Sequence, residues 1–295
     1  MVKYTNKYKF PKTIYNLLAL ETYEKSGDIS VTTLIGPPQI NVLRVKHEDE
    51  MVIDVKDRMF SVFGTAVHSM LEQVFEEGDL VEKRLITPIT TPLGTLELSG
   101  KPDLLDKEGN LRDYKVTSGW SVLHGEAKPE WEAQLNIYKW MLEQEGYEVR
   151  RLVIDAIIRD WGESLARRTD GFPKTMYKRV PINIWSKERV ENYIQDRTIL
   201  HQQAIGGEVV ECTEEERWAR PSQYAVMKRG RKKALKLFQA CDIEQAYLMA
   251  DRLKAGHYVE YRSGQNIRCE KYCDVAKYCK QYATIKEINE KEMLS

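Results

Sequence analysis

Two stretches of alternating apolar and polar residues flank a cluster of turn-forming residues in the first half of the chain. Residues 94–100 (GTLELSG) and 111–117 (LRDYKVT) each alternate as half-buried strands do. The intervening residues 106–110 (DKEGN) favour a tight turn. The pattern predicts a β-hairpin with Asp103 before its bend. Asp113 and Lys115 lie two residues apart, so their side chains leave the second strand on the same face.

Longer stretches have the periodicity of amphipathic helices. Residues 60–77 form one such stretch, with His68 and Glu72 one turn apart beside an apolar stripe of Phe63, Val67, Met70, Leu71 and Val74. Further helices are predicted over 12–24, over 130–145 and from a cap at Ser186 to about residue 205. Ser30 or Thr32 is expected to cap a helical turn that Pro37 and Pro38 stop.

The remaining periodic segments predict strands. Residues 152–161 are almost continuously apolar, as a strand buried on both faces is, and residues 176–185 alternate. A long loop is expected over 160–176. Together with residues 83–117 these strands predict an α/β protein whose central mixed sheet is flanked by helices. We expect a core over 1–207 and an accessory region over 208–295, where the character of the sequence changes.

Composition narrows the classes of protein without assigning a function. The 295 residues contain 45 Lys and Arg and 45 Asp and Glu, so a nucleic-acid partner would have to bind a local basic patch. No apolar run predicts a membrane span or a signal peptide, so we expect a cytoplasmic protein with no membrane partner. The five cysteines do not resemble a secreted disulfide framework and favour metal ligation instead.

Asp103, Asp113 and Lys115 are the first candidates for chemistry. Carboxylate oxygens suit a hard cation such as Mg²⁺, and a nearby ammonium group can stabilise negative charge that develops on a phosphate. An Asp-x-Lys pair on a polar hairpin is also a common surface ion pair, and from these residues alone that interpretation is favoured.

Four elements together resemble the RecB-type branch of the PD-(D/E)XK nuclease superfamily, which includes phage exonucleases and CRISPR-associated adaptation nucleases. They are Pro102-Asp103, Asp113-Tyr114-Lys115, the helical Gly64-x-x-x-His68-x-x-x-Glu72 and the pair Gln134-x-x-x-Tyr138. The resemblance implies a restriction-endonuclease-like core and a metal-dependent deoxyribonuclease, most simply an exonuclease. A protein of recombination, replication or repair is a compatible partner.

The resemblance also implies roles for individual residues. Asp103, Asp113 and His68 would hold Mg²⁺ or Mn²⁺, and the Val116 carbonyl is a further candidate ligand. Lys115 would orient the attacking water or stabilise developing charge. Gln134 and Tyr138 would lie near the active site and help to position DNA.

Three cysteines near the C-terminus, Cys269, Cys273 and Cys279, can converge on one centre if the segment turns tightly. Cys212 is the best fourth ligand, whereas Cys241 is expected to be a buried thiol. The resemblance implies a [4Fe–4S] cluster that pins the C-terminal region to the core. The sequence departs from the family pattern in two ways: the first pair is separated by three residues instead of two, and the N-terminal cysteine is absent. A cluster therefore ranks first, zinc second and no metal third.

A basic run lies in the C-terminal third. Lys228, Arg229, Arg231, Lys232 and Lys233 are candidates for contacts to DNA phosphates, although runs of charge usually form a solvated surface. Two other functions stay open: a nuclease-like DNA-binding module that needs a partner for activity, and an iron–sulfur or zinc interaction module in which the acidic residues are incidental.

Overall fold

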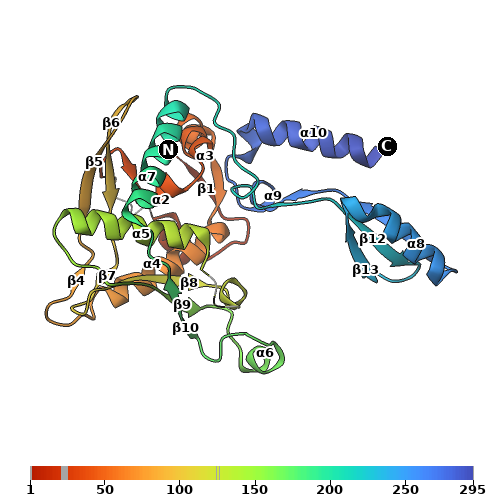
Figure 1. Ribbon diagram of the computed structural model, residues 1–295, viewed down its shortest axis with the longest axis horizontal. Coiled ribbons are helices and arrows are strands. Elements are labelled where there is room, and N and C mark those ends of the chain that lie inside the picture. The colour runs from red at the N-terminus through yellow and green to blue at the C-terminus, as the bar shows by residue number, and fades with distance from the viewer. Residues whose placement is uncertain (1, 21–25, 124, 126, 295) are drawn as a thin grey trace. The chain divides into compact units, whose positions relative to one another are not determined.

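The computed structural model describes residues 2–20, 26–123, 125 and 127–294 (Figure 1). The chain forms two compact units. Unit 1 comprises Met1–Pro38 and Val52–Glu208, and unit 2 comprises Gln39–Met51 and Val209–Ser295. Within the described residues no helix combines the length and the apolar character that a membrane span requires.

Unit 1 is built on a five-stranded mixed sheet in the order β10-β9-β8-β7-β4. At its centre β8 runs parallel to β9, and the other neighbours are antiparallel. The strands are β4 (Leu80–Val81), β7 (Leu104–Leu105), β8 (Asn110–Thr117), β9 (Arg151–Ile158) and β10 (Tyr177–Ile182). A separate sheet has the order β2-β6-β5, and β1 pairs with β3. These strands are β1 (Lys3–Thr5), β2 (Ile29–Ser30), β3 (Val52–Asp54), β5 (Leu85–Thr91) and β6 (Gly94–Gly100).

The predicted pairing of 94–100 with 111–117 is wrong. Strand β6 pairs with β5, from Leu85 opposite Gly100 to Thr91 opposite Gly94, and it lies in a different sheet from β8. The turn before β8 instead joins it to β7, which is only two residues long. Asp106 closes that turn, because its carboxylate accepts the Asn110 backbone N–H at 2.8 Å. Alternation identifies a strand but does not identify its partner.

The helices of unit 1 follow the predicted periodicity more closely. They are α1 (Lys12–Ala19), α2 (Val31–Ile35), α4 (Met59–Leu71), α5 (Pro129–Gln144), α6 (Glu163–Arg168) and α7 (Lys187–Ile205), with 3₁₀ turns η2 (Val55–Arg58) and η3 (Gly119–Val122). The predicted caps are confirmed: Ser30 accepts from the Thr33 N–H and Ser186 from the Arg189 N–H. Helix α6 lies within the predicted loop, and residues 21–24 of the first predicted helix fall outside the described residues.

Helix α5 supplies much of the core of unit 1 and runs across the five-stranded sheet (Figure 1). Its buried residues include Trp131, Leu135, Tyr138 and Leu142, the face predicted from their spacing. They pack with the apolar residues of β8 and β9, among them Leu111 and Ile154. This packing fixes the strand that carries Asp113 against a rigid helix.

Helix α4 differs from its prediction. It ends at Leu71, and none of its residues is buried. Met70 is 71% exposed, and Val74, beyond the end of the helix, is 78% exposed. The predicted apolar stripe therefore lies largely at the surface, because periodicity shows which side chains share a face and not whether that face is covered.

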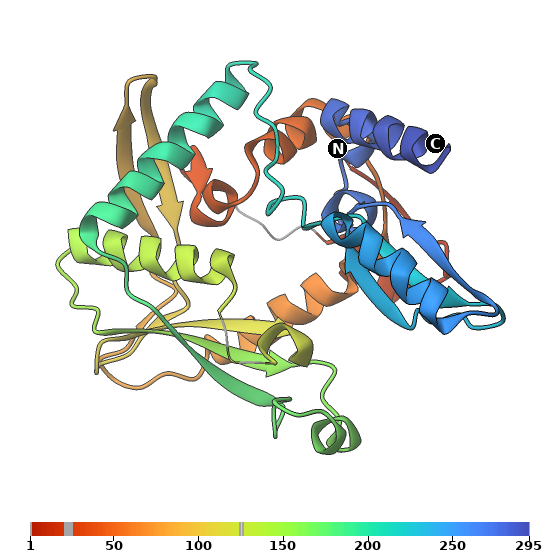
Figure 2. The same ribbon diagram turned by 45° about the vertical axis from the view of Figure 1, so that its right-hand side comes forward.

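Unit 2 combines the segment 39–51 with the C-terminal third of the chain. A three-stranded sheet, β13-β12-β14, is packed against α8 (Figure 2). Its elements are α3 (Pro38–Lys46), η1 (Glu48–Glu50), β11 (Ala219–Arg220), β12 (Gln223–Lys228), β13 (Lys236–Gln239), η4 (Ala240–Asp242), α8 (Ile243–Leu253), β14 (His257–Arg262), β15 (Gln265–Asn266), α9 (Ile267–Lys271), η5 (Ala276–Tyr278) and α10 (Lys280–Leu294). Pro37 and Pro38 end the first helical turn as predicted, but α3 begins at Pro38, a position where proline is well tolerated.

Candidate active site

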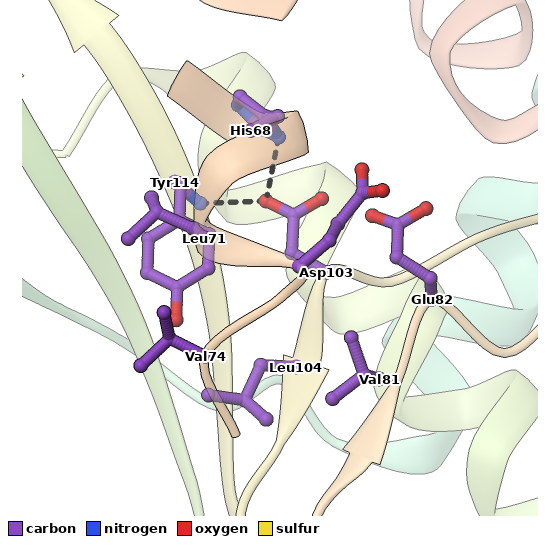
Figure 3. A pocket seen from close by; sticks show the side chains of 9 residues that line it. His68, Leu71, Val74, Val81, Glu82, Asp103, Leu104 and Tyr114 are labelled. Atoms are coloured by element: carbon purple, nitrogen blue, oxygen red, sulfur yellow. Dashed lines mark hydrogen bonds and ion pairs between the residues drawn. The ribbon is translucent and has the colours of Figure 1, made fainter. Parts of the chain in front are cut away.

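Asp103 immediately precedes β7 and is held by the neighbouring strand and by α4. Its Oδ2 atom accepts the Tyr114 backbone N–H at 2.7 Å and lies 3.4 Å from His68 Nδ1 (Figure 3). The side chain of Asp103 is 11% exposed. The short β7–β8 hairpin thus brings Asp103 beside the Asp-x-Lys strand, although the predicted partner strand is different.

Asp113 and Lys115 leave the same face of β8 and form an ion pair, with 2.6 Å between Lys115 Nζ and Asp113 Oδ2. Asp113 is 2% exposed, and among the described residues its Oδ2 has no hydrogen-bond partner in good geometry. Burial and, to a smaller extent, the nearby Asp103 raise the pKa of Asp113 to about 6 against the opposing effect of Lys115. The strand therefore holds a carboxylate whose negative charge is only partly compensated.

His68 extends from α4 toward Asp103. Its ring also meets the Tyr114 ring edge-on, with 6.1 Å between the ring centroids. Its hydrogen bond to Asp103 raises the pKa of His68, and partial burial opposes that shift. Asp113 and Lys115 act on His68 in opposite directions. The structure thus brings His68, Asp103, Asp113 and Lys115 within electrostatic reach of one another.

Gln134 and Tyr138 are both buried on α5, with 3.4 Å between Gln134 Nε2 and Tyr138 Oη. Burial raises the pKa of Tyr138, and the charges of Asp113 and Asp103 raise it in addition. The Tyr138 ring also lies against Gly100, where a Cβ atom would approach ring carbon Cε1 to 2.9 Å. Tyr138 therefore supports the segment that leads to Asp103.

Glu82 is a site residue that the sequence analysis missed. It follows β4, has a φ of +51°, and lines one pocket with His68, Glu72, Asp103 and Tyr114. Figure 3 shows Glu82 among the side chains that line the same pocket as Asp103. Glu82 pairs with Lys101, and its backbone N–H donates to the Asp103 carbonyl at 3.1 Å. The sequence held no signal for it, because β4 is two residues long and has no recognisable pattern.

The Val116 carbonyl is already engaged. Arg159 Nη1 lies 3.5 Å from it, and the Arg159 guanidinium carbon lies 4.5 Å from the centre of the Phe60 ring. The Arg159 backbone N–H donates to the Thr117 carbonyl at 2.9 Å, which fixes the residue at the end of β8. A cation bound to this carbonyl would lie near the positive Arg159 guanidinium, which disfavours binding there.

The donor set suits a hard divalent cation. Asp103, Asp113 and Glu82 offer carboxylate oxygens and His68 offers a ring nitrogen. The buried and under-partnered Asp113 Oδ2 is an atom that a cation would satisfy. As the side chains stand, no three His, Cys, Asp or Glu residues of the described part of the chain converge closely enough to hold an ion. Binding would therefore require side-chain rotations, beginning with Lys115 or His68.

In unit 2, four cysteines line one pocket: Cys212, Cys269, Cys273 and Cys279. All are free thiols, and burial raises the pKa of Cys212 to about 12 and raises those of Cys269 and Cys273. The other cysteines raise the pKa of Cys212 as well, because thiolates in one pocket repel each other. Cys241 is exposed, so its predicted burial is wrong.

The walls of the cysteine pocket come from distant parts of the sequence. Gln281 fixes Cys212 by accepting its backbone N–H at 3.0 Å and donating to its carbonyl at 2.9 Å. Arg44 of α3 donates to the Asp274 carboxylate, and His47 stacks on Tyr278 with 4.0 Å between ring centres. The segment 39–51 is thereby attached to the loop that carries Cys273 and Cys279. Four thiols in such a pocket have the composition of a zinc or iron–sulfur ligand set.

Several solved structures are similar to this chain at low sequence identity. Among solved structures, SSO0001 is similar at 14% identity, with a TM-score of 0.43 over 63% of this chain and 84% of that chain. An alkaline exonuclease (LHK-Exo) from Laribacter hongkongensis gives 14% identity and a TM-score of 0.36, over 60% of this chain and 89% of that chain. LHK-Exo in complex with dAMP gives 14% identity and a TM-score of 0.33, over 60% and 93%.

Comparison with curated proteins gives no match. The model of the PD-(D/E)XK nuclease superfamily matches residues 77–280, more than two thirds of the chain. The matched range contains Asp103, Asp113 and Lys115 and lies C-terminal to His68. The mixed sheet flanked by helices agrees with the restriction-endonuclease-like architecture expected from the sequence. The chain belongs to the PD-(D/E)XK nuclease superfamily.

Proposed function

We propose that the protein is a Mg²⁺- or Mn²⁺-dependent deoxyribonuclease that acts as an exonuclease. One observation carries the proposal: two carboxylates from adjacent elements, Asp103 and the buried Asp113, lie together with Lys115 and His68. Family membership supports the nuclease chemistry. The local charge supports a cation, since burial and the neighbouring carboxylate raise the pKa of Asp113.

Asp103, Asp113 and His68 would hold the ion, and Glu82 lines the same pocket as Asp103 and His68. The bound ion would lower the pKa of a coordinated water and neutralise charge on the scissile phosphate. Lys115 now compensates Asp113 at 2.6 Å. With an ion bound at Asp113, the ammonium group of Lys115 would orient the attacking water and stabilise the phosphate.

Gln134 and Tyr138 act as positioning residues in this proposal. Both side chains are buried, so they support the active-site residues through packing and do not contact DNA directly. Tyr138 packs against Gly100, three residues before Asp103. Its loss should therefore displace Asp103 and lower the rate of cleavage more than the affinity for DNA.

The test is digestion of end-labelled linear DNA beside covalently closed circular DNA, in Mg²⁺, in Mn²⁺ and in EDTA. Metal-dependent loss of the linear substrate alone would support an exonuclease, and cutting of the circle would show an endonuclease. Asp113→Ala and Lys115→Ala should abolish cleavage with the fold intact by circular dichroism. Full activity in either variant contradicts the proposed site. Binding without cleavage under every metal condition would favour the alternative DNA-binding module.

We further propose that the four cysteines hold a [4Fe–4S] cluster, with zinc as the second choice. Their shared pocket supports a common centre, and binding of that centre would displace the protons of the thiols. Anaerobically purified protein should be brown and absorb near ~400 nm. Iron-free protein with one zinc per chain would select the second choice. Metal-free protein with four reactive thiols would exclude both.

A further inference from the structure

Unit 2 contains a small layered body that is distinct from the cysteine pocket. Strands β12, β13 and β14 form its sheet, and α8 covers one face. Val226, Phe238, Ala246 and Ala250 form its apolar cluster, with Tyr224, Met249 and Val259 packed around them. The β12–β13 hairpin is therefore held by its own packing, and its turn has a defined position on this body.

The hairpin turn carries a concentrated positive charge. We call it the basic wing: Lys228, Arg229, Arg231, Lys232, Lys233 and Lys236. All six side chains are exposed, and none forms an ion pair with a described residue. No Asp or Glu occurs between Glu216 and Asp242. In a chain of zero formal net charge, these cations are segregated from their counter-charges.

The turn is braced by the backbone. The Arg231 N–H donates to the Lys228 carbonyl at 2.9 Å, and Gly230 supplies a φ of +80° that other residues rarely adopt. The Arg229 N–H donates to the Gly256 carbonyl at 2.7 Å, which ties the wing to the loop between α8 and β14. The wing therefore presents its cations from a fixed turn.

The adjacent loop adds to the charge. His257 lies opposite Lys228 in the ladder, and Lys254 occupies the left-handed region with a φ of +53°. Asp251, in the last turn of α8, lies three residues before Lys254, and its backbone carbonyl accepts the Lys254 N–H at 3.2 Å. The cations of the wing form no ion pair with Asp251 or with another carboxylate of the described residues, so their mutual repulsion is left for a ligand to relieve.

We propose that the basic wing is a second DNA-binding surface, separate from the catalytic residues, which binds backbone phosphates without reading sequence. The proposal rests on the proposed nuclease function, because that function identifies the polyanion as DNA. A row of exposed Lys and Arg without interleaved aromatic residues suits phosphate contacts better than base stacking. A second contact on the same chain would retain DNA between successive cleavage events.

The proposal predicts a specific salt dependence. Each phosphate contact contributes a slope of about −0.9 to log K against log salt for duplex DNA. The variant Arg231→Gln/Lys232→Gln/Lys233→Gln should therefore reduce the slope by about 2–3. Its affinity at about 0.1 M salt should fall between ten-fold and several-hundred-fold.

The experiment measures anisotropy of a labelled linear duplex with the full chain in EDTA, over about 50 to 200 mM salt. The control Lys12→Gln/Lys174→Gln/Lys271→Gln removes three exposed cations from other places. A second control, Arg231→Lys/Lys232→Arg/Lys233→Arg, keeps the charge of the wing. Loss confined to the first variant, with the charge-preserving variant binding as the parent does, supports the wing.

Equal loss in the first variant and in the scattered control, or no loss in either, overturns the proposal. Binding of the parent to phosphatidylserine vesicles but not to DNA also overturns it, and assigns the wing to a membrane surface. The measurement is independent of catalysis. A protein that binds DNA through the wing but never cleaves it would contradict the proposed nuclease, whereas cleavage with unchanged binding in the wing variant would contradict the wing alone.

Discussion

Replacing Asp113 by asparagine should stabilise the protein that carries no metal. Asp113 is 2% exposed, and burial raises its pKa from 3.8 to about 6. A native pKa above the unfolded value means that the folded state binds its proton more tightly. Stability therefore falls as the pH rises from about 4 to about 6, and the loss stays constant above that range. Asparagine has nearly the same shape and cannot carry the charge.

The pKa shift sets the size of the effect. A difference of about two units corresponds to about 3 kcal/mol at neutral pH, with the attraction to Lys115 already included. The variant should gain about 1–3 kcal/mol above pH 6, allowing for imperfect replacement of the carboxyl group, and nothing below pH 4. For a unit of this size the gain corresponds to a rise in Tm of roughly 3–10 °C.

Thermal unfolding in EDTA, followed by circular dichroism from about pH 4 to pH 8, measures this difference. Asp155→Asn is the matched control. Asp155 is a buried carboxylate on the neighbouring strand β9, but it accepts from Arg112 at 2.6 Å and from Tyr177 at 2.6 Å. Its loss should therefore destabilise the protein at neutral pH. Parallel pH profiles for the parent and Asp113→Asn, or a lower Tm for Asp113→Asn at neutral pH, would contradict a raised pKa of Asp113.

Three further predictions concern the same sites. Gly100→Ala should cost about 1–3 kcal/mol of stability and reduce cleavage, because its Cβ would meet the Tyr138 ring at 2.9 Å; unchanged Tm and activity would contradict this. Affinity for Mn²⁺ by calorimetry should increase as the pH rises through the raised pKa of His68, since the proton shared with Asp103 competes with the ion, and His68→Gln should flatten that dependence. The same His68–Asp103 pair stabilises the metal-free fold fully below pH 6.5, and this contribution is lost as the pH rises through the raised pKa. Cys212→Ala should lower both the bound metal per chain and the Tm of the holoprotein, and an unaltered metal content would remove Cys212 from the ligand set.

Local signals predicted local structure well. The caps at Ser30 and Ser186 and the buried face of α5 follow from side-chain chemistry within a few residues, and the structure has all of them. The proximity of Asp103, Asp113 and Lys115 could also be predicted from the sequence, because a tight turn at 106–109 brings them together whichever strand precedes it.

The same sequence patterns could not predict contacts between residues far apart in the chain. Strand β6 could pair with β5 before it or with β8 after it, and the alternation of apolar and polar residues is compatible with both pairings. Glu82 enters the site through a two-residue strand and a backbone bond to Asp103, neither of which has a sequence pattern. The attachment of α3 to the cysteine loop through Arg44 and Asp274 joins residues that are 230 positions apart.

Three places in the described part of this chain collect groups that suit a ligand. Asp113 is a buried carboxylate with partial compensation, four cysteine thiols line one pocket, and the basic wing gathers cations without ion pairs. The buried carboxylate and the gathered cations cost folding free energy in isolation, and each of the three places suits a ligand of a different kind: a hard cation, a soft metal centre and a polyanion. Because the formal net charge is zero, this separation reflects where the charges lie and not an excess of either sign. Binding at each place should therefore stabilise its own unit, so metal removal and DNA removal should lower Tm in separable steps.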